Sequence, residues 1–155
     1  MERKNPAKKK GIENQNYTES QHTAYCISQR YGSQPFAEIL DNEKGALKRR
    51  EFDILFELNL KDYLKDHLKN MPSQVILSVC NPETASSAIS KDPQTGIFLP
   101  CSVTVKEVEQ ENIEVSIEDT GITWSPSKEL TQIAQKTTET LKGILSEVEQ
   151  PGMKL

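Results

Sequence analysis

The sequence has few of the residues on which common enzyme classes depend. It contains two histidines and lacks a glycine-rich phosphate loop, a Cys-x-x-Cys pair and a His-Glu-x-x-His zinc motif. A histidine-based general base therefore has few candidates. His67, on a predicted helix, has only Asp66 nearby as a second ligand. These absences favour a binding domain over an enzyme, and they predict neither a cofactor nor a bound metal.

The sequence also lacks a run of eighteen apolar residues, so no segment is predicted to cross a membrane. No apolar signal segment follows the Lys-rich start, and three cysteines fit poorly with a secreted disulfide framework. We therefore expect a cytoplasmic location with reduced thiols. The net charge of −4 and the isoelectric point of about 5.3 argue against a nucleic-acid-binding role.

The predicted domain organisation is one domain between two tails. A chain of 155 residues is long enough for a single buried core without a disulfide or metal. Residues 1–20 are Lys-rich and too polar to offset their ordering entropy, so we expect a flexible tail there. That tail is either an arm for an anionic partner or a solvated leader. Residues 21–150 form the domain, and residues 151–155 a short C-terminal tail.

The pattern of apolar residues predicts five strands and four helices in an α+β order. Two strands joined by a tight hairpin must be antiparallel, and amphipathic helices need a sheet face to cover. We therefore expect an antiparallel sheet of about five strands covered by helices. The expected strands are 21–28, 53–59, 74–80, 95–108 and 113–119, and the expected helices are 34–50, 60–70, 82–91 and one from Pro126 capped by Ser125.

The stretch from Gln74 to Lys106 holds the most distinctive residues, including two cysteines beside prolines. Asn81 is a favoured N-cap residue and Pro82 suits the first helical position, so both are explained by a helix start. Cys80 lies just ahead of that cap. A thiol near a helix N-terminus ionises more readily, which is a condition for nucleophilic chemistry.

Strand alternation separates the two cysteines. Cys101 shares a face with Val103 and Val105, which predicts a place in the core, while Cys80 is out of phase with the apolar residues of its own strand. Pro100 inside a strand requires an edge or a bulge, and a bulge would reverse the alternation. A dithiol site therefore depends on a bulge at Pro100.

Two motifs suggest a family. They are Val-Cys-Asn-Pro-Glu-Thr-Ala at 79–85 and Gly-Ile-Phe-Leu-Pro-Cys-Ser-Val-Thr-Val at 96–105. With the strand and helix at 52–68, they resemble the bacterial and archaeal family called domain of unknown function 302. The resemblance covers 35–119 well and the final helix loosely. It implies a TATA-box-binding-protein-like topology with two short inserted helices, usually as a homodimer, and it carries no activity.

Three hypotheses remain open for the motifs. The first is a binding domain for a small ligand or partner beside Cys80-Asn81-Pro82 and Leu99-Pro100-Cys101, where helix N–H groups suit an anionic ligand. The second is a thiol-dependent role in redox or sulfur handling that uses Cys80 with Cys101. In the third, both motifs only determine the fold.

Overall fold

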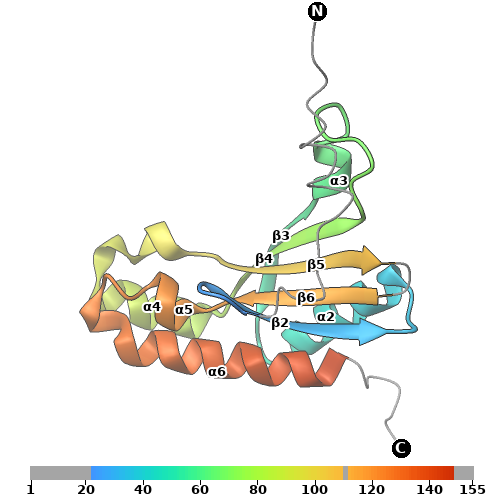
Figure 1. Cartoon of the computed structure of the whole chain (residues 1–155). Coiled ribbons are helices and arrows are strands. Elements are labelled where there is room, and N and C mark those ends of the chain that lie inside the picture. The colour runs from blue at the N-terminus through green and yellow to red at the C-terminus, as the bar shows by residue number, and fades with distance from the viewer. Residues whose placement is uncertain (1–21, 110–111, 149–155) are drawn as a thin grey trace, which may run out of the picture.

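The computed structural model describes residues 22–109 and 112–148 and contains a sheet with helices packed on one face (Figure 1). The predicted tails 1–20 and 151–155 lie outside the described residues. Within those residues the sheet is antiparallel, with strand order β1-β2-β6-β5-β4-β3. The strands are β1 (His22–Thr23), β2 (Cys26–Gly32), β3 (Asp53–Asn59), β4 (Gln74–Cys80), β5 (Cys101–Glu109) and β6 (Asn112–Glu118). The α+β prediction is confirmed.

The two faces of the sheet differ because apolar and polar residues alternate along each strand. In β4 every second residue is buried. The buried set continues across the neighbouring strands and forms the core beneath the helices. It comprises Tyr31, Val75, Leu77, Val79, Cys101, Val103, Val105, Ile113, Val115 and Ile117. The opposite face, which we call the open face, carries the intervening polar side chains.

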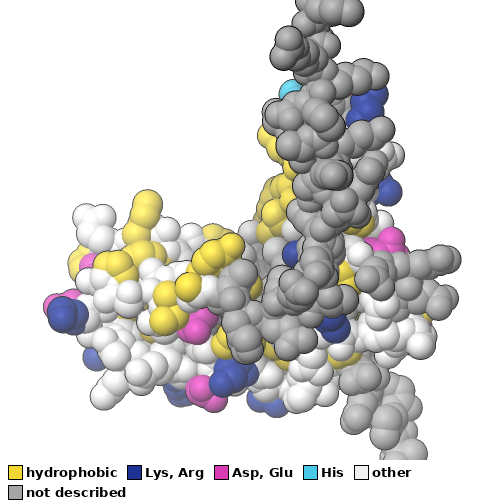
Figure 2. Space-filling view, in the orientation of Figure 1, with side chains coloured by type: hydrophobic (Ala, Val, Ile, Leu, Met, Phe, Trp, Pro, Cys, Tyr) yellow, Lys and Arg dark blue, Asp and Glu magenta, His cyan; other side chains and the backbone are white. Residues whose placement is uncertain are grey.

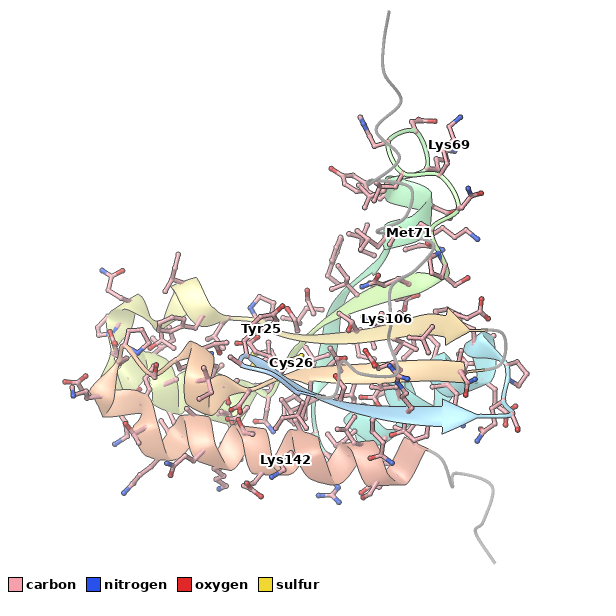
Figure 3. All side chains as sticks on the ribbon, in the orientation of Figure 1. Tyr25, Cys26, Lys69, Met71, Lys106 and Lys142 are labelled. Atoms are coloured by element: carbon pink, nitrogen blue, oxygen red, sulfur yellow. The ribbon has the colours of Figure 1, made fainter. Side chains whose placement is uncertain are left out.

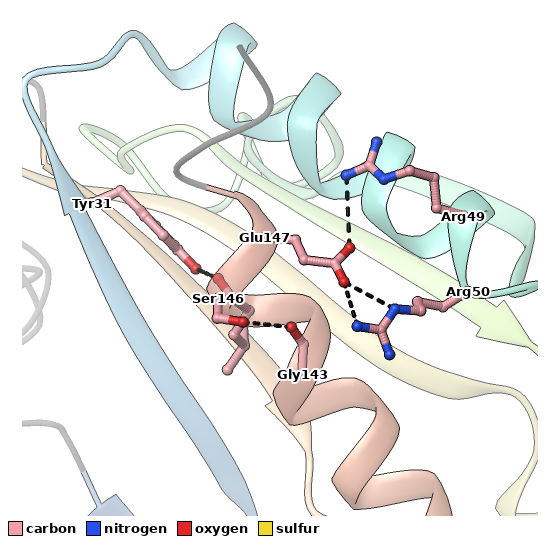
Figure 4. A network of polar contacts seen from close by, with 7 residues as sticks. Tyr31, Arg49, Arg50, Gly143, Ser146 and Glu147 are labelled. Atoms are coloured by element: carbon pink, nitrogen blue, oxygen red, sulfur yellow. Dashed lines mark hydrogen bonds and ion pairs between the residues drawn. The ribbon is translucent and has the colours of Figure 1, made fainter. Parts of the chain in front are cut away.

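Two helices cover the buried face, α2 (Phe36–Arg49) and α6 (Thr131–Val148), and a third, α4 (Pro82–Lys91), packs against α6 beyond the end of the sheet (Figure 1). Helices α2 and α6 pack against each other as well as on the sheet. Figure 4 shows polar contacts that accompany this packing. The Tyr31 hydroxyl of β2 donates to the Leu145 carbonyl, and Nε of Arg50 donates to Glu147 Oε1 at 2.9 Å. These contacts tie the end of α6 to both β2 and the end of α2.

A projecting arm is formed by the outer ends of β3 and β4 with the short helix α3 (Leu60–Tyr63) (Figure 1). Asn59 caps this helix as predicted, since its side chain accepts from the Asp62 amide at 3.1 Å. The helix ends at Tyr63 instead of Asn70. No residue of α3 is buried, so nothing in the core extends the helix beyond one turn. The prediction of a longer helix was wrong.

The strand predicted for 95–108 was too long at its start. Residues Pro93–Phe98 form a 3-10 helix, η1, and β5 begins at Cys101 after the cis peptide at Leu99-Pro100. The buried Thr95 hydroxyl lies 2.5 Å from the Asp92 carbonyl and 3.2 Å from the Ala88 carbonyl, so it links η1 to the end of α4. Pro100 lies just before β5, and the β4–β5 register runs unbroken from Cys101 to Lys106, so the strand has no bulge that would reverse its alternation.

Two other boundaries also differ from the predictions. The first long strand runs from Cys26 to Gly32 instead of 21–28, because it pairs along all of β6. The final helix starts at Thr131, after the short elements α5 (Thr120–Thr123) and η2 (Lys128–Leu130). Ser127, near the expected start, donates to the Asp92 carboxylate at 2.6 Å. Trp124 is buried and stacks on Phe98, with ring centroids 6.3 Å apart, so its side chain is part of the core.

Candidate functional site

The start of α4 is built as the sequence predicts. The Asn81 side chain accepts from the Thr84 amide at 3.1 Å, and its carbonyl accepts from the Ala85 amide at 2.9 Å. Pro82 has no N–H to donate. Among the described residues, the Glu83 amide is therefore the one N–H group of the first turn that has no hydrogen-bond acceptor. The helix start therefore presents one backbone donor to a ligand instead of several.

The two predicted thiols lie on opposite faces of the sheet. Val79 is the cross-strand partner of Cys101, so Cys80, the next residue, points to the open face. Cys101 is 2% exposed and Cys80 is half-buried. Because β5 has no bulge at Pro100, the condition for a dithiol site is not met.

Neither thiol is activated by its surroundings. Burial, and then the nearby Asp53 carboxylate, raise the pKa of Cys80. Burial, followed by the charges of Glu118 and Cys80, raises the pKa of Cys101 far above its usual range. A raised pKa lowers the thiolate fraction at neutral pH, and the thiolate is the reactive form. Desolvation and the Asp53 charge therefore disfavour the thiolate form of Cys80.

A hollow of about 300 Å³, which we call the Asn81 groove, lies beside the start of α4. Three segments distant in sequence meet there: the end of α2, the first turns of α4 and the middle of α6. Its lining is rich in hydroxyl and charged groups. The lining residues are Arg50, Glu51, Phe52, Asn81, Glu83, Thr84, Ser87, Ile133, Lys136, Thr137 and Thr140.

The charges in the Asn81 groove are mixed. Arg50 supplies a guanidinium group that also pairs with Glu147, and Lys136 supplies an exposed ammonium group. Glu51 and Glu83 add two exposed carboxylates. The Thr137 hydroxyl donates to the Ile133 carbonyl at 2.8 Å, so its oxygen still has acceptor capacity. The groove can thus bind a ligand that has both an anionic group and hydrogen-bond donors.

A second hollow of about 370 Å³, the open-face groove, crosses β2, β6 and β5 on the uncovered side of the sheet. Most of its side chains end in a hydroxyl, a carboxylate or an amine. They are Tyr25, Cys26, Ser28, Ser102, Thr104, Lys106, Glu114, Ser116, Ile117, Glu118 and Thr123. Figure 3 shows Tyr25 and Cys26 at one end of this face and Lys106 toward the other.

Hydrogen bonds organise the open-face groove. The Ser28 and Ser116 hydroxyls are 2.7 Å apart, and Glu118 accepts from the Ser102 amide at 3.1 Å. Glu114 is only 2% exposed and pairs with Arg30 at 3.2 Å and with Lys106 at 3.4 Å. Sequence reasoning missed this site because its residues form no motif. Its one signal was the shared polar face of Ser102, Thr104 and Lys106.

The structure brings only part of the predicted site together. Asn81 lines the Asn81 groove, whereas Cys80, Pro82, Pro100 and Cys101 line neither hollow. Within residues 22–109 and 112–148, no cluster of His, Cys, Asp or Glu side chains is arranged to hold a metal ion. No described helix has the length and apolar content needed to span a membrane.

The family follows from the match between the chain and a family model. The model described as "Domain of unknown function DUF302" matches residues 27–148. The chain belongs to the DUF302 family. A solved DUF302 structure, an uncharacterized conserved protein from Bacillus stearothermophilus, has a TM-score of 0.73 and 22% identity, covering 81% of this chain and 99% of that one. It shows a shared fold. A search of curated proteins found no match. DUF302 membership assigns no activity.

Proposed function

We propose that this DUF302 domain binds a small anion bearing hydroxyl groups, in the Asn81 groove. The proposal rests on the convergence of Arg50, Asn81 and Lys136 from three separate segments around one hollow of about 300 Å³. Ligand sites commonly combine a concave surface with a few convergent polar groups. The position agrees with the site predicted beside Asn81, although Cys80 and Cys101 do not take part.

The charges favour an anionic group beside Lys136 and Arg50. The Glu83 amide adds a donor at the positive end of the α4 dipole, close to the same hollow. Glu51 and Glu83 offer acceptors to ligand hydroxyls, and they disfavour a ligand that has only negative charge. Glycerol 3-phosphate has both an anionic group and hydroxyls, and it is therefore the probe for the test.

The test compares two lysines on the same helix. Lys136 lines the groove, whereas Lys142 pairs with Glu139 at 3.6 Å on an outward surface of α6 (Figure 3). Titration calorimetry with glycerol 3-phosphate should detect binding by the unmodified protein. Lys136→Ala should weaken it about tenfold through loss of one charge-assisted contact, and Lys142→Ala should leave it unchanged. Absence of binding, or equal effects of both variants, would refute the proposed site.

We also propose that the protein forms a homodimer through β3, the outer strand next to β4. On and near β3, Leu55, Phe56 and Tyr63 are 61%, 56% and 70% exposed. Figure 2 shows apolar side chains gathered along this arm. An exposed apolar edge strand is a template for pairing with another strand, and a second copy would pair with it about a two-fold axis.

Light scattering after gel filtration tests the dimer. Phe56→Lys should shift the mass from dimer to monomer, because it places a charge on the apolar edge. Ile89→Lys, which changes an exposed isoleucine on α4, is the control and should remain dimeric. A monomeric unmodified protein would contradict the dimer, and a dimeric Phe56→Lys protein would contradict this interface.

The expected cytoplasmic location also remains a proposal. It is supported by the three cysteines, which form no disulfide, because thiols stay reduced in the cytoplasm. The geometry does not favour the thiol-dependent alternative, because Cys80 and Cys101 point to opposite faces of the sheet and burial raises the pKa of each thiol. We therefore develop only the binding function.

A further inference from the structure

We propose that the ligand of the Asn81 groove carries an ammonium group as well as its anionic group, and that Glu51 binds this ammonium group. The inference rests on the proposed function, because it concerns the same groove and the same ligand. The groove then takes a small molecule that combines an anionic group, hydroxyl groups and an amine. Glu51 becomes the residue that selects this class over ligands without an amine.

The charged groups that line the Asn81 groove are unequally paired. Arg50 pairs with Glu147, so its guanidinium group already faces a carboxylate. Lys136, Glu51 and Glu83 form no ion pair within residues 22–109 and 112–148. A ligand that is only anionic pairs with the lysine but leaves both carboxylates unpaired. A ligand that also has an ammonium group can pair with one of them as well.

Glu51 occupies a backbone position that favours glycine. Its amide donates to the Lys48 carbonyl at 3.1 Å, and the next amide, that of Phe52, donates to the Leu47 carbonyl at 3.0 Å. These two bonds form a Schellman motif, in which the residue just after the helix takes left-handed backbone angles and is usually glycine. Glu51 has a φ of 64°. Its side chain therefore adds strain that glycine would not have.

The charge of Glu51 is also unfavourable for α2. A helix C-terminus is the negative end of the helix dipole and disfavours a carboxylate. Arg49 and Arg50, the adjacent cations, pair with Glu147 and not with Glu51. Glu83, by contrast, lies in the first turn of α4, where the dipole stabilises its charge. The fold therefore explains Glu83 but not Glu51, and departures from local preference are typical of functional residues.

An ammonium group suits Glu51 better than a hydroxyl group does. The Glu51 residue is exposed at the end of α2, whereas Lys136 lies in the middle of α6, so the two sides of the groove carry opposite charges. A contact between a carboxylate and an ammonium group combines charge with hydrogen bonding and is about twice as strong as a neutral hydrogen bond. The anionic group stays beside Lys136, and the ammonium group binds across the groove.

Two ligands that differ in one group test the inference. Glycerol 3-phosphate has a hydroxyl on its central carbon, where 2-amino-3-hydroxypropyl phosphate has an ammonium group. Titration calorimetry should show that the amino ligand binds about tenfold more tightly, through one added charge-assisted contact. Equal or weaker binding of the amino ligand would overturn the inference, while the proposed function would stand if glycerol 3-phosphate still bound through Lys136. If neither ligand binds, both proposals fail.

Three variants identify the group that binds each end of the ligand. Glu51→Gln removes the charge but keeps a hydrogen-bond acceptor, so it should abolish the preference for the amino ligand without weakening glycerol 3-phosphate. Glu83→Gln is the matched control in the same groove, and it should shift both ligands by the same factor. Lys136→Ala should weaken both ligands equally, because both carry a phosphate. A preference that survives in Glu51→Gln, or is lost in Glu83→Gln, would overturn the assignment to Glu51.

Glu51→Gly tests whether the fold itself selects this glutamate. Glycine adopts left-handed backbone angles without strain, so the variant should unfold at a higher urea concentration than the unmodified protein. The same variant should lose the preference for the amino ligand. A glycine variant that unfolds at a lower urea concentration would show that Glu51 stabilises the fold, and it would overturn the assignment of Glu51 to the ligand.

Discussion

Glu43 on α2 is completely buried and lies within electrostatic reach of Glu147 on α6. Neither carboxylate oxygen of Glu43 has a hydrogen-bond partner among the described residues. Desolvation, followed by the negative charge of Glu147, raises the pKa of Glu43 to about 7. Arg49 and Arg50, the cations at the end of α2, both pair with Glu147 and not with Glu43 (Figure 4).

Stability should therefore fall as the pH rises from about 4.5 to about 7, the ordinary and the folded-state pKa of Glu43. The folded state binds more protons than the unfolded state in this window, so raising the pH favours unfolding. The loss is on the order of 3 kcal/mol above the folded-state pKa. Urea unfolding at pH 5 and pH 8 measures it.

Glu43→Gln should remove most of this pH dependence and make the protein more stable than the unmodified chain at pH 8. Glu139→Gln, at an exposed site on α6, is the matched control and should leave the profile unchanged. A profile that is the same with and without Glu43 would show that another group controls stability in this range.

Replacing the cap of α4 should destabilise the domain without any ligand present. Asn81→Ala removes the acceptor for the Thr84 amide and should cost about 1 kcal/mol of unfolding free energy. Asn59→Ala removes the equivalent bond at α3, a helix without buried residues, and should cost less. Urea unfolding of both variants makes the comparison, and an equal cost would contradict the difference in packing.

The thiols should react slowly in the folded protein. Burial raises the pKa of both Cys80 and Cys101, so alkylation of either by iodoacetamide should be slower than that of a free thiol at pH 7.5. Mass spectrometry of the labelled peptides, with the urea-unfolded chain as control, measures both rates. Rapid labelling of Cys80, or a Cys80–Cys101 disulfide after mild oxidation, would restore the thiol-dependent hypothesis.

Thr95→Val should loosen the segment between α4 and β5. The variant keeps the side-chain shape but loses the hydroxyl that contacts the Asp92 and Ala88 carbonyls, at a cost of about 1 to 2 kcal/mol. Ser90→Ala, which removes an exposed hydroxyl bond within α4, should cost much less. Hydrogen exchange should locate the change in residues 92–99, and uniform exchange across the domain would contradict a local role for Thr95.

The sequence by itself determined the elements whose signals are local. The strands at 53–59 and 74–80 and the helix at 82–91 have the predicted bounds. Each of these elements is defined by residues within it or next to it: the strands by their alternation of apolar and polar side chains, and the helix by its Asn81 cap and Pro82. Cys101 was placed in the core for the same reason, since alternation along a strand fixes which face a side chain occupies.

Only the tertiary structure decided features that depend on contacts between distant segments. Residues 95–98 are predicted as strand, but they belong to η1, where the Thr95 hydroxyl contacts the carbonyls of Asp92 and Ala88. The open-face groove exists because β2, separated by about 85 residues from β6, pairs beside it and brings Ser28 to Ser116. Glu43 is buried because α6 packs against α2 and excludes water from its carboxylate. Local sequence carries no record of such long-range contacts, and these contacts form both grooves.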